Sequence, residues 1–106
     1  MATIEDFRKI EMCTARIVEA VEHPNADKLY VLKVDIGGEI RQVVAGIRLF
    51  YGKEELAGRE VIFVKNLAPA VIRGIESNGM VLAAKDESAL TLLALDKQVK
   101  TGSPVS

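Results

Sequence analysis

The residue types that carry most enzyme chemistry are few and scattered in this chain. It has one histidine, His23, in the segment HPNADK, and one cysteine, Cys13. A zinc site needs a cluster of Cys and His side chains. A Cys13–His23 nucleophile pair has no supporting local signature, and Cys13 is better explained as a small buried side chain. We interpret His23 as a loop residue that fills a turn.

Glycine-rich and acidic patterns also lack the signatures of enzyme active sites. GIESNG separates two glycines by four residues, but no Lys-Ser or Lys-Thr follows, so it is not a phosphate-binding P-loop. It also differs from the Gly-x-Ser-x-Gly nucleophile elbow. The acidic residues are too scattered to predict paired carboxylate catalysis. We therefore expect a protein that is not an enzyme, with no metal and no cofactor.

Residues suited to nucleic-acid contact suggest recognition by shape. Fourteen basic and fifteen acidic residues give a net charge of −1, which argues against nonspecific coating of nucleic acid. Single-strand binders stack bases on aromatic rings. We expect Tyr30 and Phe63 in the core and only Phe50 and Tyr51 partly exposed, so few rings remain for stacking. Shape and backbone recognition of a folded RNA fits better.

Length and composition predict a single domain, residues 1–106. Hydrophobic residues make up 49% and charged residues 27%, as in ordinary globular proteins. One cysteine excludes an internal disulfide and fits a reducing compartment. The longest uncharged runs, such as SALTLLAL, are far shorter than the roughly 20 residues of a membrane span. MATIEDFRK lacks the apolar stretch of a signal peptide, so we expect a cytoplasmic protein without membrane contact.

Sequence periodicity then predicts the elements that position these residues. A capping box at Thr3–Asp6 opens a short helix through Lys9. Alternating or β-branched apolar segments predict strands. They are 14–22, 29–36, 40–44, 60–66, 79–84 and 90–95. A second short helix is predicted over 52–58, between two glycines.

The turn at Gly37-Gly38 allows two registers for the second and third strands. A two-residue turn pairs Ile36 with Glu39 and Val34 with Arg41. A three-residue turn pairs Ile36 with Ile40, Leu32 with Val44 and Asp35 with Arg41. We prefer the three-residue turn, because it keeps one face apolar and adds a cross-strand ion pair.

Three strands, a short helix and two more strands is the element order of an all-β OB-fold, a five-stranded Greek-key barrel. An SH3-like barrel or a small sandwich is the alternative, and the helix between strands three and four disfavours it. OB-folds bind oligonucleotides on strands two and three and on the loops that join strands one to two and four to five. Here those loops are 23–28 and 67–78, and the second is unusually long for a compact domain.

Two blocks, HPNADKLYV and RGIESNGMVLAA, together with IEDFRKIEM, YGKEELAGR and VKNLAP, resemble one family along nearly the whole chain. It is the structure-specific tRNA-binding domain. It occurs as a small free-standing bacterial protein, as the C-terminal appendage of many methionyl-tRNA synthetases, and in endothelial monocyte-activating polypeptide II. The resemblance implies an OB-fold with a small C-terminal extension, homodimerisation, and binding to the outer corner of the L-shaped tRNA.

The resemblance also implies which residues bind tRNA. The family's Lys, Ser and Met are present as Lys28, Ser77 and Met80. We expect Lys28 and Ser77 to be exposed and to contact phosphate or sugar, and Met80 to contact a ribose or base face. The alternatives are a solvated Lys28, a Ser77 that only forms a turn, and a Met80 that fills the core. The same loops supply three further expected contacts: Asn25, Arg73 and Asn78.

The chain departs from the family pattern in the loop between strands four and five. Relatives usually carry basic residues beside the proline of this loop, where this chain has Ala68, Ala70 and Val71. Asn78 stands where Gln is common. Fewer cations predict weaker and less salt-dependent tRNA binding.

The synthetase signatures His-Ile-Gly-His and Lys-Met-Ser-Lys-Ser are absent from the chain. We therefore expect an accessory that holds tRNA near an aminoacyl-tRNA synthetase catalytic unit. A dimerisation, protein-docking or chaperone-like module stays open as the alternative. The apolar run 90–95 supports the expected homodimer.

Overall fold

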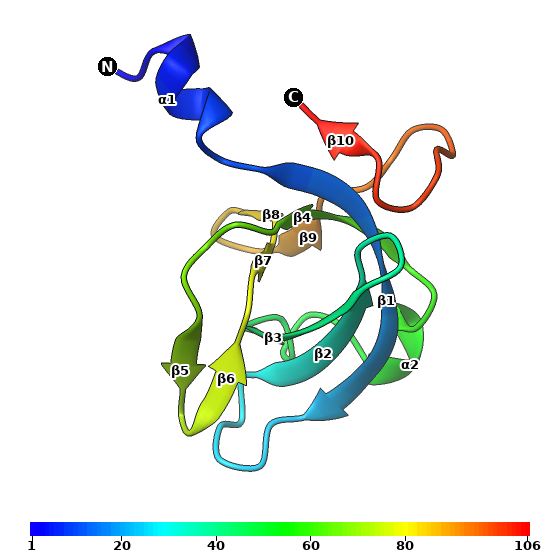
Figure 1. Cartoon of the computed structure of the whole chain (residues 1–106). Helices are drawn as coiled ribbons and strands as arrows, with labels where there is room; N and C mark the ends of the chain where they lie inside the picture. Colours follow the sequence, from blue (N-terminus) through cyan, green and yellow to red (C-terminus); the bar gives the residue numbers. More distant parts are fainter.

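The computed structural model describes all 106 residues as a small antiparallel barrel with elements added at its two ends (Figure 1). Five strands form the barrel in the order β3-β2-β1-β4-β7. They are β1 (Met12–Glu22), β2 (Tyr30–Asp35), β3 (Ile40–Ala45), β4 (Glu60–Val64) and β7 (Met80–Val81). Helix α2 (Lys53–Leu56) lies between β3 and β4 in the chain, and this arrangement confirms the predicted OB-fold.

The long first strand makes the barrel possible because it belongs to two parts of the sheet. The first half of β1 pairs with β4 and the second half with β2. Its register against β2 shifts between Ile17 and Glu19, a β-bulge that bends the strand. The core is apolar and includes Cys13, Tyr30 and Phe63, as expected.

The hairpin of β2 and β3 corrects the preferred register. Val34 lies opposite Arg41 and Leu32 opposite Val43, the pairing of the two-residue turn. Asp35 explains the choice: its carboxylate accepts the Gly37 and Gly38 amides at 2.9 and 3.0 Å. Both glycines have positive φ, which a tight two-residue hairpin requires. The expected Asp35–Arg41 ion pair is wrong, since Arg41 pairs with Glu39.

The segment 67–78, predicted as a loop, contains a second small hairpin. Strands β5 (Ala70–Ile72) and β6 (Ile75–Ser77) pair through a two-residue turn at Arg73-Gly74, both in the left-handed region. Sequence alternation is weak over three-residue strands, so the turn was the only available signal. Figure 1 shows this hairpin standing beside the barrel, next to the loop between β1 and β2.

The C-terminal third also differs in detail from the prediction. The segment expected as one strand, 79–84, divides into β7 and β8 (Ala83–Lys85), and β8 pairs with β9 (Leu90–Leu92). The tail is not merely polar: β10 (Pro104–Val105) pairs with the start of β1. Helix α1 (Ile4–Arg8) has the predicted Thr3–Asp6 capping box and buries none of its residues. No helix is long and apolar enough to span a membrane.

Candidate nucleic-acid interface

His23 joins the loop between β1 and β2 to the β5–β6 hairpin. The residue is 2% exposed. Its Nδ1 accepts the Asn25 backbone amide at 3.0 Å, so Nε2 carries the ring hydrogen and donates to the Ile72 carbonyl, also at 3.0 Å. The interpretation of His23 as a turn filler was therefore incomplete, because one of its two bonds crosses to another loop.

Two of the expected site residues strengthen this connection. The Arg73 guanidinium donates to the Asn25 carbonyl at 3.0 Å, and the Asn25 side-chain amide donates to the Arg73 carbonyl at 3.4 Å. The tip of the hairpin and the loop between β1 and β2 thus form one continuous rim. Loops 48 residues apart in the chain become a single surface.

Ser77 lies in the interior, which corrects the expectation that it is exposed. It is 5% exposed, and its Oγ accepts the Val44 backbone amide at 2.9 Å. Beside it the Asn78 amide donates to the Gln42 carbonyl at 2.8 Å. Ser77 therefore attaches the hairpin to the free edge of β3.

Lys28 and Met80 are both exposed. Lys28 makes no ion pair, so its ammonium is free for phosphate. Met80 is 47% exposed on β7, so the core-filler alternative is wrong. Asn78 is half-buried, and its side chain accepts from the Arg41 guanidinium at 3.5 Å.

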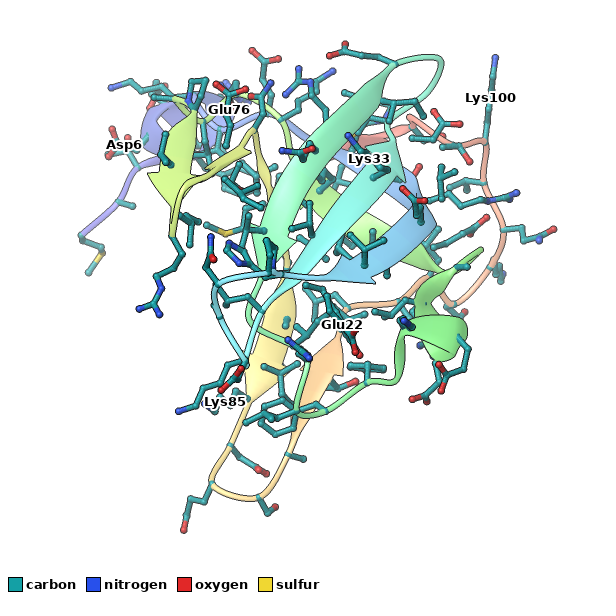
Figure 2. The ribbon with its side chains drawn as sticks, turned by 90° about the horizontal axis from the view of Figure 1, so that it is seen from below. Asp6, Glu22, Lys33, Glu76, Lys85 and Lys100 are labelled. Atoms are coloured by element: carbon teal, nitrogen blue, oxygen red, sulfur yellow. The ribbon has the colours of Figure 1, made fainter.

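Lys33 is a candidate binding residue that the sequence analysis did not select. Its Nζ donates to the Gln42 side chain at 2.9 Å, and Gln42 in turn donates to the Glu76 carbonyl at 3.0 Å. Lys33 has no carboxylate partner, so its charge is oriented but not neutralised. Figure 2 shows Lys33 on the outer face of β2. Alternation had placed it on this face, which is the signal that would have identified it.

The departures from the basic family pattern lie at the surface. Ala68, Ala70 and Val71 are all exposed, and Val71 is 72% exposed. Arg73 is the one cation of the hairpin, and its guanidinium is held at Asn25. Positive charge on this face therefore comes mainly from the barrel and from the loop between β1 and β2.

Cys13 has no part in this interface. It is 1% exposed in the core, and burial raises the pKa of its thiol, an effect that Lys65 and Arg41 partly oppose. The neutral thiol is a small apolar side chain there, as expected. No group of three or more His, Cys, Asp or Glu side chains is arranged to hold a metal ion.

Comparisons with known proteins agree with this geometry. The model of a family described as a putative tRNA-binding domain matches residues 12–104. The chain is 53% identical to a methionine–tRNA ligase of Pyrococcus furiosus over 103 residues, which is 97% of this chain but 14% of the ligase. For the ligase of Methanoregula boonei the identity is 50%, over 99% of this chain and 16% of the ligase.

Two solved structures align with the whole chain. One is a MetRS-related protein from Pyrococcus horikoshii, with a TM-score of 0.92, 34% identity and 98% of that chain covered. The other is the chaperone CsaA of Bacillus anthracis, with a TM-score of 0.90, 28% identity and 99% of that chain covered. From the family match and these identities, the chain belongs to the tRNA-binding domain family.

Proposed function

We propose that this chain binds tRNA without catalysing a reaction and recognises the outer corner of the L-shaped molecule by shape. The supporting observation is the rim formed by the loop between β1 and β2 and the β5–β6 hairpin, which His23 and the Asn25–Arg73 pair hold together. A pre-formed rim suits a folded RNA, which is read mainly through its backbone and shape.

Lys28 and Lys33 are the proposed phosphate contacts. Both are cations without carboxylate partners, so phosphate binding does not have to break an existing ion pair. Lys28 lies in the loop that precedes β2, and Lys33 lies on β2 itself. Contacts of this kind position the RNA without reading its sequence.

The remaining site residues take different roles. Met80 offers adaptable apolar contact to a ribose or base face. Asn25, Arg73 and Asn78 are engaged with the protein, so they shape the rim and present their remaining hydrogen-bonding groups. Ser77 positions the hairpin through its bond to the Val44 amide.

The relatives suggest how such binding serves the cell. The chain spans about one seventh of the methionine–tRNA ligases it matches. We propose that it works in the cytoplasm as an accessory to aminoacylation, where it holds tRNA near a synthetase catalytic unit. A tethered binding module raises the effective concentration of its ligand at the second site.

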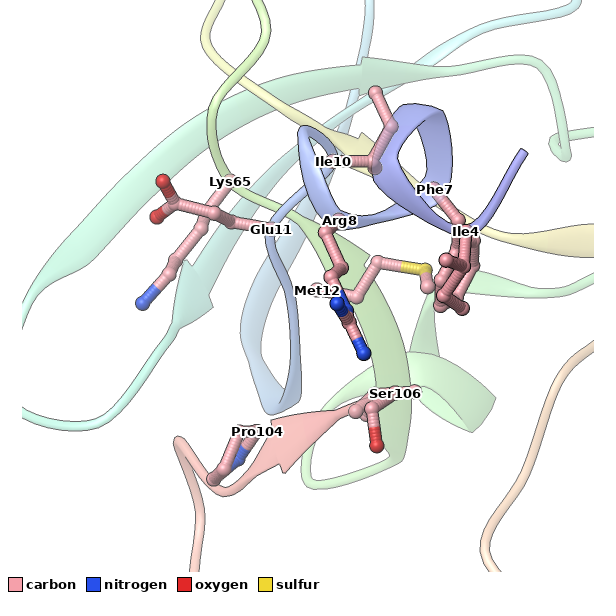
Figure 3. Close-up of a pocket in the computed structure, with 10 residues that line it drawn as sticks. Ile4, Phe7, Arg8, Ile10, Glu11, Met12, Lys65, Pro104 and Ser106 are labelled. Atoms are coloured by element: carbon pink, nitrogen blue, oxygen red, sulfur yellow. The ribbon is translucent and has the colours of Figure 1, made fainter. Parts of the chain in front are cut away.

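We further propose a homodimer, with its interface at the N-terminal segment. The run 90–95, our original reason, is partly core, since Leu92 is 5% exposed. The N-terminal segment instead exposes Ile4 and Phe7 of α1 and Ile10 just after it, at 55%, 42% and 42%, and these residues line a groove of about 600 Å³. Figure 3 shows these side chains together with the C-terminal strand. A five-residue helix is unstable alone, so a second copy packed here would stabilise it.

A protein-docking or chaperone-like module is the second candidate. It is favoured by the alignment with the CsaA chaperone over the whole chain and by the uncharged hairpin positions. Filter-binding titrations with total tRNA, a duplex and a single strand of matched length separate the two. We expect the tightest binding to folded tRNA. Equal affinity for all three RNAs would contradict recognition by shape. A chain that binds unfolded protein but does not bind tRNA would support the chaperone-like function.

A further inference from the structure

An apolar groove runs between the free edge of β3 and β7, and the β5–β6 hairpin covers one side of it. β3 and β7 are the two ends of the strand order, and no strand pairing closes the barrel between them. The groove has a volume of about 350 Å³. Its floor and walls include Val44, Ile72, Met80 and Val81. This volume is at the small end of the range for ligand pockets, about 300–1,000 Å³.

Ser77 gives this groove a directed polar group. Its Oγ accepts the Val44 amide, but its hydroxyl hydrogen donates to no acceptor in the protein. Ser77 lines the groove and is 5% exposed. A hydroxyl donor with no partner in a buried position favours a ligand that brings an acceptor to it.

The charges around the groove indicate what kind of ligand it takes. None of the residues that line it is charged. At one end Lys28 accepts the Arg48 amide through its backbone, next to the lining residues Gly46 and Ile47. At the other end the Arg41 guanidinium donates to the carbonyls of Lys65 and Asn78. Arg41 is also paired with Glu39, so Lys28 supplies the free cation. An uncharged groove with a free cation at one end matches a neutral ring attached to an anionic backbone.

We infer that this groove binds one unstacked nucleobase of the bound RNA, a step that rests on the proposed tRNA-binding function. The base lies against Met80, Ile72 and Val81, and a ring nitrogen or carbonyl oxygen of the base accepts the Ser77 hydroxyl hydrogen. The phosphate on one side of the base lies toward Lys28. Proteins that read RNA specifically take bases that have left the helical stack, through apolar and hydrogen-bonding contacts of this kind.

Neighbouring alanines of β8 provide a matched test. Ala83 lines the groove, whereas Ala84 does not and points to the opposite face of the strand. Ala83→Phe fills the groove without removing a charge or a hydrogen bond. We expect it to weaken binding of total tRNA more than tenfold without changing the salt slope, because no phosphate contact is lost. Ala84→Phe, as control, should bind within twofold of the parent.

Cross-linking provides a second, independent measurement. A tRNA transcript containing 4-thiouridine is irradiated on the parent protein and the products are mapped by mass spectrometry. We expect nucleotide adducts on the segment 79–83. A thermal melt of each variant checks folding, and Ala70→Leu fills the groove from the hairpin side if Ala83→Phe is unstable.

The outcomes separate the two proposals. If the parent fails to bind tRNA, both the proposed function and the groove inference are overturned. If the parent binds but both groove-filled variants bind equally well and adducts avoid 79–83, the groove inference alone is overturned. If Ala83→Phe no longer binds a reduced, unfolded protein but still binds tRNA like the parent, the groove inference is overturned in favour of a groove that binds peptides.

Discussion

The connection made by His23 can be tested with two substitutions that each keep one of its hydrogen bonds. In His23→Asn the side-chain oxygen occupies roughly the place of Nδ1 and still accepts the Asn25 amide at the original 3.0 Å site. In His23→Gln the amide nitrogen occupies roughly the place of Nε2 and still donates to the Ile72 carbonyl. One variant therefore keeps the loop, and the other keeps the contact between the loop and the hairpin.

The expected loss of unfolding free energy follows from the hydrogen-bond partner that each variant leaves unpaired. His23 is 2% exposed, so the lost partner is left in a site with little water. Leaving a buried backbone group unpaired costs about 1–3 kcal/mol, and both variants should lose unfolding free energy in this range. Only His23→Asn should also free the hairpin. Part of that cost then appears on binding, when tRNA must order the rim: about 1–2 kcal/mol, or roughly 5–30-fold in affinity.

Three measurements follow: denaturant unfolding, amide hydrogen exchange over Ala70–Ser77, and filter binding of tRNA. We expect similar loss of stability in both variants, but faster exchange in the hairpin and weaker tRNA binding only in His23→Asn. If the two variants bind tRNA equally and exchange alike over the hairpin, the connection between the loops does not position the rim, and His23 is a structural residue only.

Four further outcomes are expected. Lys33→Ala should weaken tRNA binding and lower the salt slope by about one unit, whereas Lys97→Ala, in the exposed C-terminal segment, should change neither; equal slopes in all three proteins would exclude Lys33 as a phosphate contact. Val71→Lys adds a cation on the hairpin outside the groove and should tighten binding and steepen the slope, and no change would show that this side of the hairpin faces away from the RNA. Phe7→Glu places a charge on the apolar face of α1, so sedimentation should show monomers where the parent forms dimers; a parent that sediments as a monomer throughout the micromolar range contradicts the homodimer. The amides of Gly37 and Gly38 lower the pKa of Asp35 in the folded protein. Its carboxylate therefore stabilises the fold at a pH above the unfolded-state pKa of about 3.9, and this effect is lost as the pH falls through the lower folded-state pKa. Asp35→Asn should be less stable than the parent at pH 7, and the difference in stability should shrink below about pH 4.

Local pattern was enough to predict the barrel. Alternation over LYVLKVDI placed Leu32, Val34 and Ile36 in the core, and all three are buried there. The capping box at Thr3 and the glycines that bound α2 predicted two short helices, and both are present. These predictions succeeded because they depend on interactions between residues close in the chain, where periodicity and capping act directly.

The roles of Ser77 and His23 could not be obtained in that way. Nothing near Ser77 in the sequence indicates that its hydroxyl lies at the Val44 amide, 33 residues away, or that it is buried. The expectation of an exposed Ser77 assumed that a polar loop residue faces solvent, but here the loop folds into a hairpin and covers the free edge of β3. His23 was likewise one histidine in a turn until the hairpin brought the Ile72 carbonyl to its Nε2.

By itself, then, the sequence determined the strand order, part of the core, the two candidate binding loops, and the exposed Lys28. Tertiary structure alone decided the burial of Ser77, the rim joined by His23, and the groove beside Ser77. The physical reason is range. A residue's preference for a strand, a cap or the core is set by its neighbours in the chain, whereas a hydrogen bond between loops requires the barrel to place both partners first.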